Sequence, residues 1–324
     1  MIWLTWRQFR TQATVVFLAL ALLAVLLAVT GPQLAGLYAS AGDDLFGRIT
    51  SADRSVYYLG LVIVLLVPAV IGMFWGAPLI TRELETGTYR LAWNQSITRT
   101  RWLATKLVLT GVATMAAAAL ASLAVTWWSG PIDRAVDSAG TGAQPFYPRI
   151  DPLVFGGRGI VPIGCAAFAF MLGVTLGVLI RRTVPAMAAT LATYAAVQIA
   201  MPLWVRPHLA PAVDATLSFT QAKPVNIGID AVREVDFGQP GAWILSEQTV
   251  DASGRTAAVP ESLTDCSSMS DCAVGLTKAG FRQQVSYQPA GNFWTLQWVE
   301  TGLYLGLALA LTGFCAWWIR RRLT

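Results

Sequence analysis

Six stretches of the chain are almost free of charge and are long enough to cross a bilayer as helices. A hydrocarbon core of about 30 Å takes about 20 helical residues. Trp, Tyr and Arg, the residues found at lipid headgroups, stand at the ends of these stretches. Because only a helix satisfies its own backbone in lipid, we predict six spanning helices. They cover residues 13–34, 57–80, 103–128, 159–180, 184–204 and 298–319.

The polar segments between these stretches alternate in charge, which predicts the orientation. With the N-terminus inside, the inner segments hold twelve basic and two acidic residues, leaving eleven basic and sixteen acidic residues outside. This bias fits the positive-inside rule and places both termini in the cytoplasm. Anionic inner-leaflet lipid accounts for the net charge of +5, so no nucleic acid is implied.

We therefore predict an α-helical integral membrane protein with cytoplasmic termini and a small mixed extracytoplasmic domain between helices 5 and 6. Hydrophobic residues at 55% and charged residues at 13% agree, because a soluble fold could not cover so much apolar surface. The predicted division is an interfacial amphipathic helix at 1–12, transmembrane helices 1–3 at 13–128 with a cytoplasmic coupling region at 81–102, an outer loop at 129–158, helices 4–5 at 159–204, the extracytoplasmic domain at 205–297, and helix 6 with a basic tail at 298–324.

The first dozen residues leave two interpretations open. Ile2, Trp6, Phe9 and Ala13 share one helical side, which suits a helix lying flat in the interface, and a plain basic flank to span 1 is the alternative. A signal peptide competes, but the apolar run extends to Gly42, beyond the usual length of about 7–15 residues, and no small-x-small cleavage motif stands out. We expect an uncleaved first helix.

The long segment at 205–297 carries signals of a folded domain. The stretches GAWILSEQTV and RTAAVPESL flank the turn DASG and predict a β-hairpin. Tyr287, Phe293, Trp294 and Trp298 gather just before span 6 and predict an aromatic collar on the outer surface. A loop of this length is more often folded than slack.

Two cysteine pairs differ in their expected state. Cys165 and Cys315 lie in spans 4 and 6, where a thiol acts as a small apolar side chain. Cys266 and Cys272 lie in the outer segment DCSSMSDC, where oxidising conditions permit a disulfide. A disulfide is the favoured interpretation, and a metal pair is disfavoured because no His lies nearby.

Enzymatic chemistry finds little support in the residues. The single His, His208, stands at the start of an outer loop, and neither a metal-spaced cluster nor a Gly-x-Ser-x-Gly motif is present. The sequence contains no Gly-Lys pair and so no phosphate-binding loop for ATP. Glu300 is the one candidate for an intramembrane proton relay, and an interfacial carboxylate at the outer end of span 6 is the preferred interpretation.

Small residues four apart and two prolines mark how the spans could pack. Gly pairs of this spacing lie in spans 2, 4 and 6 and let helix backbones approach closely. They are Gly72 and Gly76, Gly173 and Gly177, and Gly302 and Gly306. Pro68 and Pro78 are expected to bend span 2, because each removes a backbone donor.

The inner connection at 81–102 has the sequence TRELETGTYRLAWNQSITRTRW. It contains helix-capping and aromatic residues, which argue against an unstructured linker. Gly87 breaks an acidic turn, Thr88 can cap the helical stretch after it, and Thr98 can cap the helix leading into span 3. Tyr89, Leu91 and Trp93 offer apolar and aromatic contacts. The pattern predicts a short docking helix that stands off the membrane. The alternative is a solvated surface on which Glu83 and Glu85 pair with Arg82 and Arg90.

The stretch RELETGTYRLAWNQSITRTRWLATK, residues 82–106, resembles the region between spans 2 and 3 of the type-2 ABC exporter permeases. That family's pattern is an acidic pair, Gly-Thr, an apolar helix, a Pro-containing turn, then Ser/Thr-Arg and Lys. Ser96 stands near the position where many members have proline. The span arrangement and the inner RRT loop at 181–183 also resemble this family, and the C-terminal stretch at 287–322 resembles its Ala-rich bacterial members. The matching positions are Glu83, Glu85, Gly87, Thr88, Thr98, Arg99 and Lys106.

The resemblance implies a multi-pass protein of the bacterial cell membrane, and it implies a mechanism. Two permease subunits pair as a homodimer or heterodimer, and each rests a coupling helix on a separate ABC ATPase subunit, which binds ATP and Mg. By that carry-over Glu83 and Glu85 would meet basic residues of the ATPase, Gly87 and Thr88 would shape the entry to the helix, and Arg99 would belong to the same coupling region. Tyr89, Leu91 and Trp93 would supply the buried contacts.

The leading hypothesis is thus a transmembrane permease subunit of an ATP-driven exporter that moves an amphipathic or lipid-like substrate, such as a drug or antibiotic. It contains no catalytic residue or metal site of its own. The alternative is a membrane-anchored sensory or ligand-binding protein that uses the outer domain at 205–297. Dependence on an ATPase subunit distinguishes the two.

Overall fold

The computed structural model describes residues 2–42, 45–87, 98–138, 146–220, 223–227, 232–260 and 268–322. Within these residues the protein is predominantly helical, and six helical segments are long and apolar enough to cross a membrane, as predicted. They are Phe9–Ala41, Ser51–Thr86, Arg101–Trp128, Val161–Ile180, Thr183–His208 and Ala290–Arg321.

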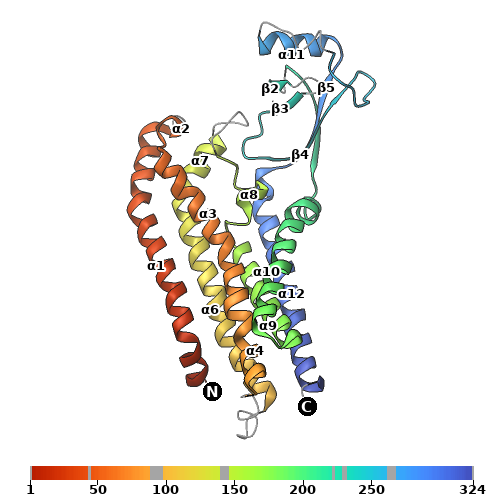
Figure 1. Ribbon diagram of the computed structural model, residues 1–324. Coiled ribbons are helices and arrows are strands. Elements are labelled where there is room, and N and C mark those ends of the chain that lie inside the picture. Colours follow the sequence, from red (N-terminus) through yellow and green to blue (C-terminus); the bar gives the residue numbers. More distant parts are fainter. Residues whose placement is uncertain are drawn as a thin grey trace.

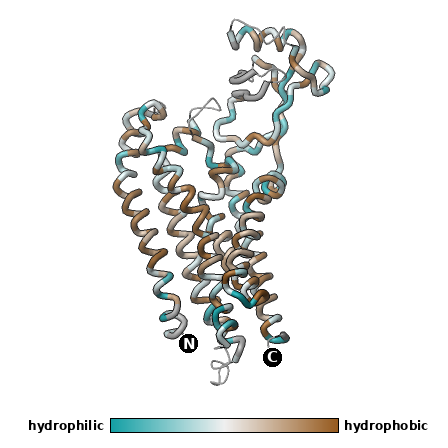
Figure 2. The backbone as a smooth tube through the Cα atoms, in the orientation of Figure 1, coloured by the Kyte–Doolittle hydropathy of each residue, from teal (hydrophilic) through white to brown (hydrophobic). Residues whose placement is uncertain are grey.

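The six spans form an elongated bundle with both termini at one end and a small β-rich domain at the other (Figure 1). We call these the terminal end and the domain end. Hydrophobic residues dominate the bundle, and hydrophilic ones gather at its ends and in the domain (Figure 2). This distribution fits a bundle whose middle lies in lipid and whose ends lie in water, because apolar side chains are favoured in contact with lipid.

The N-terminal segment differs from the flat interfacial helix expected for residues 1–12. Helix α1 runs without a break from Ile2 to Ala41, 40 residues, and includes Pro32. At about 1.5 Å per residue it is roughly 60 Å long, about twice the hydrocarbon thickness. The basic flank is thus a continuation of span 1, because the apolar side of residues 9–13 continues in register into the span, with Phe9, Ala13 and Leu20 buried.

Span 2 changes its helical geometry between its two prolines. Helix α3 (Ser51–Ile71) begins with a capping box of Thr50 and Asp53, continues as the π-helix η2 (Gly72–Gly76), and ends as α4 (Ala77–Thr86). Pro78 has no N–H to donate to the carbonyl four residues earlier. The hydrogen-bond pattern of the helix shifts by one residue here, and the Ala77 N–H donates to the Gly72 carbonyl, five residues back. Such π segments are a known way for a helix to absorb an irregularity.

The fourth span, α9 (Val161–Ile180), lies at the centre of the bundle. It is 72% buried over its apolar window, against 22% for spans 1, 5 and 6. It contacts spans 2, 3, 5 and 6. The neighbouring helices are α6 (Arg99–Trp128), α10 (Thr183–Ala200), which continues as η3 (Met201–Val205) and η4 (Arg206–His208), and α12 (Phe293–Arg322).

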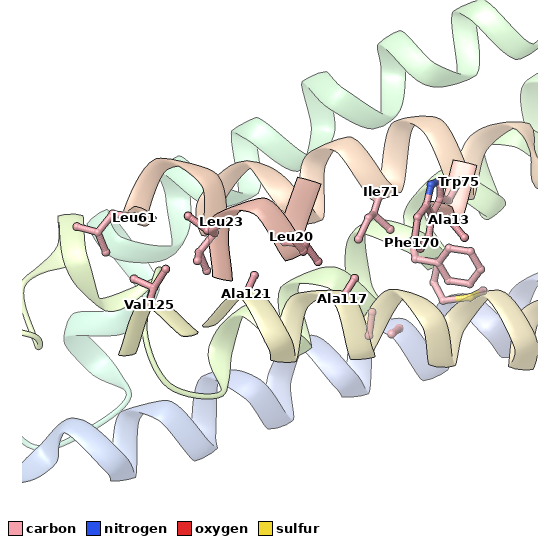
Figure 3. Close-up of a cluster of buried hydrophobic side chains, with 14 of the residues drawn as sticks. Ala13, Leu20, Leu23, Leu61, Ile71, Trp75, Ala117, Ala121, Val125 and Phe170 are labelled. Carbon is pink, nitrogen blue, oxygen red and sulfur yellow. The ribbon is translucent and has the colours of Figure 1, made fainter. Parts of the chain in front are cut away.

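The predicted small-residue patches of spans 2 and 4 meet each other. A Cβ atom at Gly173 would lie 2.2 Å from the Gly72 carbonyl oxygen, so only glycine permits this approach. The patch in span 6 is different, since Gly302 and Gly306 have no atom within 4 Å of a Cβ placed there. Next to the crossing, Ile71, Trp75 and Phe170 join the main hydrophobic cluster (Figure 3). The π segment and the glycines together bring η2 onto α9.

Short helices cover the domain end of the bundle. They are α2 (Leu45–Arg48), α7 (Gly130–Ser138) and α8 (Pro152–Phe155). Helix α7 buries Ile132, Ala135 and Val136 on one side and carries charged residues on the other. Its amphipathic pattern explains why it lies across the span ends instead of entering the bundle.

The domain between spans 5 and 6 contains two small antiparallel sheets and one helix, within the residues that the structure describes. The first sheet has the order β1-β5-β4, and the second pairs β2 with β3. The core consists of residues such as Phe219, Val285 and Leu276. The elements are β1 (Val213–Ser218), β2 (Lys223–Ile227), β3 (Val232–Asp236), β4 (Trp243–Val250), α11 (Met269–Lys278) and β5 (Arg282–Gln288).

Among the residues that the structure describes, the hairpin predicted around DASG forms only at its turn, and the last three residues of its second stretch, 261–263, lie outside that part. Gly254 donates to the Asp251 carbonyl at 2.9 Å and has φ 81°, but only one bridge, between Val250 and Thr256, extends the pairing. Strand β4 pairs with β5 instead. The reason is that β5 alternates cleanly, with Gln283, Val285 and Tyr287 facing inward, whereas the stretch after the turn contains two alanines and a proline, which are poor strand formers.

The predicted aromatic collar is also divided. Tyr287 and Phe293 are buried, at 9% and 4% exposure, while Trp294 and Trp298 are exposed at 51% and 66%. Tyr287 contacts Phe237 in the domain, and Phe293 contacts Phe155 of α8. Tyr287 therefore belongs to the core of the domain and Phe293 to the end of the bundle, and the two tryptophans are exposed.

Candidate functional site

The described residues of the predicted coupling site lie around the end of α4 and the start of α6, at the terminal end. Gly87 ends α4 in a left-handed conformation with φ 69°. Thr98 caps α6 as predicted, because its side chain accepts a hydrogen bond from the Arg101 N–H at 3.3 Å. Arg99 is the first residue of α6. Four predicted residues lie outside the described part of the chain: Thr88, Tyr89, Leu91 and Trp93.

Glu83 joins span 2 to span 3 through a buried cation. Its carboxylate forms an ion pair with the Lys106 ammonium, and the Lys106 side chain is 5% exposed. The same ammonium lies 5.0 Å from the centre of the Trp102 ring. A buried charge is tolerated only with a close partner, so this pair fixes the spacing of α4 and α6.

Glu85 joins the same end of span 2 to span 5. Its carboxylate accepts the Thr183 backbone N–H at 2.8 Å and the Thr183 hydroxyl at 2.5 Å. Thr183 is the first residue of α10, whose N-cap residue Arg182 makes no side-chain cap of its own. A carboxylate at a helix N-terminus satisfies a free donor and complements the helix dipole.

Neither carboxylate adopts the part of the surface alternative that the structure describes, which is an ion pair with Arg82. Glu83 and Glu85 bond to Lys106 and Thr183, and Arg90 lies outside the described residues. The acidic pair thus ties the end of span 2 to two other spans. Lys106 was named within the motif and the RRT loop at 181–183 as a separate feature of the sequence, but no local pattern predicts which carboxylate contacts which partner.

Replacing Glu83 by glutamine should lower the free energy of unfolding by about 2–3 kcal/mol, because Lys106 would lose a charged hydrogen-bond partner while staying buried. Titration with SDS of the purified protein in mixed micelles measures the change. Glu85→Gln is the matched control: its carboxylate is exposed, so unfolding should shift little. Equal shifts for the two variants would contradict the assignment of Lys106 as the buried partner.

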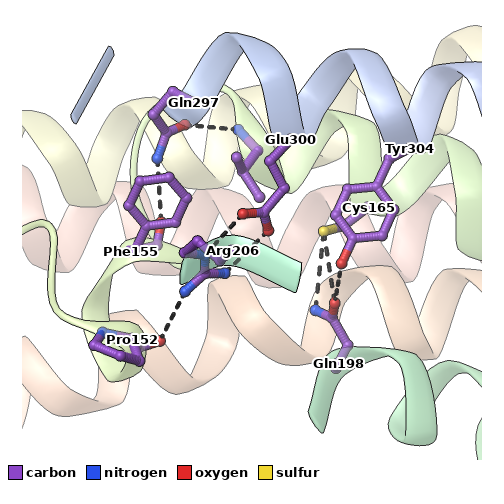
Figure 4. A network of polar contacts seen from close by, with 9 residues as sticks. Pro152, Phe155, Cys165, Gln198, Arg206, Gln297, Glu300 and Tyr304 are labelled. Atoms are coloured by element: carbon purple, nitrogen blue, oxygen red, sulfur yellow. Dashed lines mark hydrogen bonds and ion pairs between the residues drawn. The ribbon is translucent and has the colours of Figure 1, made fainter. Parts of the chain in front are cut away.

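A second buried ion pair lies near the domain end of the bundle. It was not predicted from the sequence. The Arg206 guanidinium contacts both carboxylate oxygens of Glu300, at 2.7 and 3.0 Å (Figure 4). The two side chains are 4% and 1% exposed. The preferred interpretation of Glu300 as an interfacial carboxylate is therefore wrong. Arg206, in the last turn of span 5, supplies the counter-charge that permits burial.

The ion pair is completed by the connection between spans 3 and 4. The Arg206 guanidinium lies 4.3 Å from the Phe155 ring centre and 3.5 Å from the Pro152 carbonyl. One turn away on α12, Gln297 accepts the backbone N–H groups of Ile160 and Val161, both at 2.9 Å. Span 6 thereby caps the first turn of span 4 through Gln297, and it pairs with span 5 through Glu300.

Farther along the same side of α12 the polar contacts are uncharged. The Tyr304 hydroxyl donates to the Gln198 carbonyl oxygen at 2.7 Å, and the Cys165 thiol lies 3.9 Å from that amide (Figure 4). Cys165 and Cys315 are free thiols, as predicted. In the β-rich domain Cys272 is disulfide-bonded, whereas Cys266 lies outside the described residues, so their pairing stays a prediction.

A third buried cation lies beneath α7. The Arg158 guanidinium contacts the Asp133 carboxylate at 3.3 Å and lies 5.3 Å from the Tyr57 ring centre. Burial raises the pKa of Asp133, and the positive charges of Arg158 and Arg149 only partly offset this. The described residues contain no group of His, Cys, Asp and Glu that could hold a metal ion.

These features define a class of protein: a multi-pass helical membrane protein whose spans are held together by paired buried charges and whose acidic motif at the terminal end links three of those spans. Residues 17–206 match the family described as ABC-2 membrane transporter related, which is more than half of the chain. The chain belongs to this family, and it is a permease component of an ABC transporter. No curated protein and no solved structure matches the chain.

Proposed function

We propose that this chain is the permease subunit of an ATP-driven exporter in a bacterial cell membrane, with both termini in the cytoplasm. A separate ATPase subunit binds ATP and Mg and docks on the connection between spans 2 and 3. Two permease subunits, identical or different, complete the transporter. The substrate is amphipathic or lipid-like, which agrees with spans whose buried charges, among the described residues, are paired with each other.

The observation that carries the proposal is the double attachment of the end of span 2. Glu83 holds span 3 through Lys106, and Glu85 holds span 5 through Thr183. A force applied to the chain between α4 and α6 therefore acts on three spans at once. This is the arrangement that a transporter needs when its energy source is a separate protein bound at that connection.

In this proposal the carboxylates transmit motion, and the residues after them in the chain bind the ATPase. Tyr89, Leu91 and Trp93 provide the apolar contacts, since aromatic anchors carry much of the affinity of protein interfaces. The division gives a sharper experiment than charge reversal at Glu83, which would also break the bond to Lys106.

Trp93→Ala should reduce the ATPase retained by the purified permease at least tenfold, since losing an aromatic anchor costs about 2 kcal/mol or more. The full chain is co-expressed with the ATPase encoded beside it, purified in detergent, and assayed for ATPase stoichiometry and turnover. Trp204→Ala is the matched control, because Trp204 is 71% exposed at the domain end.

If Trp93→Ala retained as much ATPase as the unaltered chain, the proposed docking role of Trp93 would be wrong. If the unaltered chain also retained no ATPase, the exporter proposal itself would fail, and the outer domain would become the candidate for a ligand-binding function. Elution as a single symmetric species verifies that each variant is folded.

A further inference from the structure

A pocket of about 220 Å³ lies between α1 and α4 at the terminal end. Phe9 and Trp75 form part of its wall, with their rings edge to face at 4.6 Å between centroids. Pro78 and Leu79 extend the apolar part of the wall. Both aromatic side chains are almost fully buried, at 4% and 2% exposure, so this part of the pocket is built into the core.

The remainder of the wall is polar and carries one uncompensated charge. Gln12, Arg82 and Glu83 line it. Glu83 is neutralised by Lys106, and within the described part of the chain no carboxylate lies within ion-pair distance of Arg82. The pocket therefore has a cationic, hydrogen-bonding side next to an aromatic side. A ligand that fits this combination has an anionic head joined to an apolar body.

The size of the pocket restricts the ligand further. Sites that enclose a drug-sized molecule have volumes of about 300–1,000 Å³. The smaller volume here accommodates a headgroup and the beginning of a chain, and the rest of the molecule must extend outside. Lipid-facing side chains such as Leu18 and Val15 of α1, exposed at 62% and 64%, continue away from the pocket along the bundle.

The position of the pocket indicates the source of the ligand. Residues of α1, η2 and α4 line it, and α1 and α4 lie at the end of the bundle that carries both termini (Figure 1). Exposed arginines gather at this end, among them Arg7, Arg10, Arg320 and Arg321. Basic residues at a membrane surface attract anionic lipids. A phospholipid of the adjoining leaflet reaches this pocket without leaving the bilayer.

We propose that the pocket binds the headgroup of an anionic phospholipid, with Arg82 and Gln12 at its phosphate and the Phe9 and Trp75 rings beside the start of its acyl chain. Such a lipid would fill the space between α1 and the end of span 2, next to the bond between Glu83 and Lys106. The site does not depend on the proposed exporter function, since it needs neither an ATPase nor a cargo.

Native mass spectrometry of the full-length protein, released from detergent after titration with phosphatidylglycerol or phosphatidylcholine, tests the proposal. The unaltered protein should bind one phosphatidylglycerol at least tenfold more tightly than Arg82→Gln, because a charge-assisted hydrogen bond is lost. Arg82→Lys should keep much of the affinity. Leu79→Trp should also weaken binding, by filling the apolar side without altering any charge.

Arg10→Gln is the matched control, since it removes an exposed arginine at the same end that does not line the pocket. Equal losses in Arg10→Gln and Arg82→Gln would show a diffuse attraction and overturn the proposal. Equal affinity for phosphatidylcholine and phosphatidylglycerol would do the same. Competition by soluble glycerol 3-phosphate as strong as that of the lipid would assign the site to a free phosphate compound and overturn the lipid.

Discussion

Replacing Arg206 by methionine should destabilise the folded protein by about 3–5 kcal/mol, because the Glu300 carboxylate, 1% exposed, would lose its counter-charge inside the bundle. Glu300→Gln should have an effect of the same sign, since it leaves the guanidinium buried without a charge partner. Unfolding in SDS measures both changes. We expect each single variant to unfold at a lower mole fraction of SDS than the unaltered protein.

The double variant Arg206→Met/Glu300→Leu tests whether the loss comes from an unpaired charge or from packing. Replacing both partners by apolar residues of similar volume is often neutral or stabilising. We therefore expect the double variant to recover most of the stability. A double variant less stable than either single one would contradict an ionic origin and assign the role of Arg206 to its contacts with Phe155 and Pro152.

The contrast between the spans and this ion pair shows what the sequence could predict. Bilayer thickness fixes the length of a spanning helix, so the apolar windows located all six spans, and the predicted ends at residues 128 and 180 coincide with the ends of α6 and α9. Partners across the bundle obey no local period. Arg206 and Glu300 are 94 residues apart, and Glu83 and Lys106 are 23 apart.

The glycine patches show the same limit in a different form. Their spacing predicted close approach, and spans 2 and 4 do approach closely at Gly72 and Gly173. The same spacing at Gly302 and Gly306 leaves open space within the chain. Glycines four residues apart leave one side of a helix without side chains, but a close contact forms only where a neighbouring helix packs against that side. That choice depends on the π segment η2, which the prolines indicated only as a bend.

The crossing of η2 and α9 should therefore be the least tolerant place in the bundle for an added side chain. In Gly173→Leu, the new Cβ would lie 2.2 Å from the Gly72 carbonyl oxygen and 2.8 Å from the Ala77 nitrogen, both of which are backbone atoms and cannot rotate away. Overpacking of a core commonly costs about 1–3 kcal/mol, and separating two spans should exceed that range. We expect this variant to insert but to lose the compact bundle, with protease cleavage in the span connections and aggregation after detergent extraction.

Gly306→Leu is the matched control, because it makes the same substitution in a spanning helix at a position with no atom within 4 Å. In an isolated chain it should leave stability unchanged or raise it slightly, since glycine in a helix interior is unfavourable by roughly 0.5–1 kcal/mol relative to alanine. Comparing protease resistance and SDS unfolding of the two variants separates a steric clash from a general intolerance of leucine. If Gly173→Leu kept the stability of the unaltered protein, the close contact of spans 2 and 4 would be refuted, and with it the position of Glu83 and Glu85 against spans 3 and 5, since both carboxylates come after that crossing on the same span.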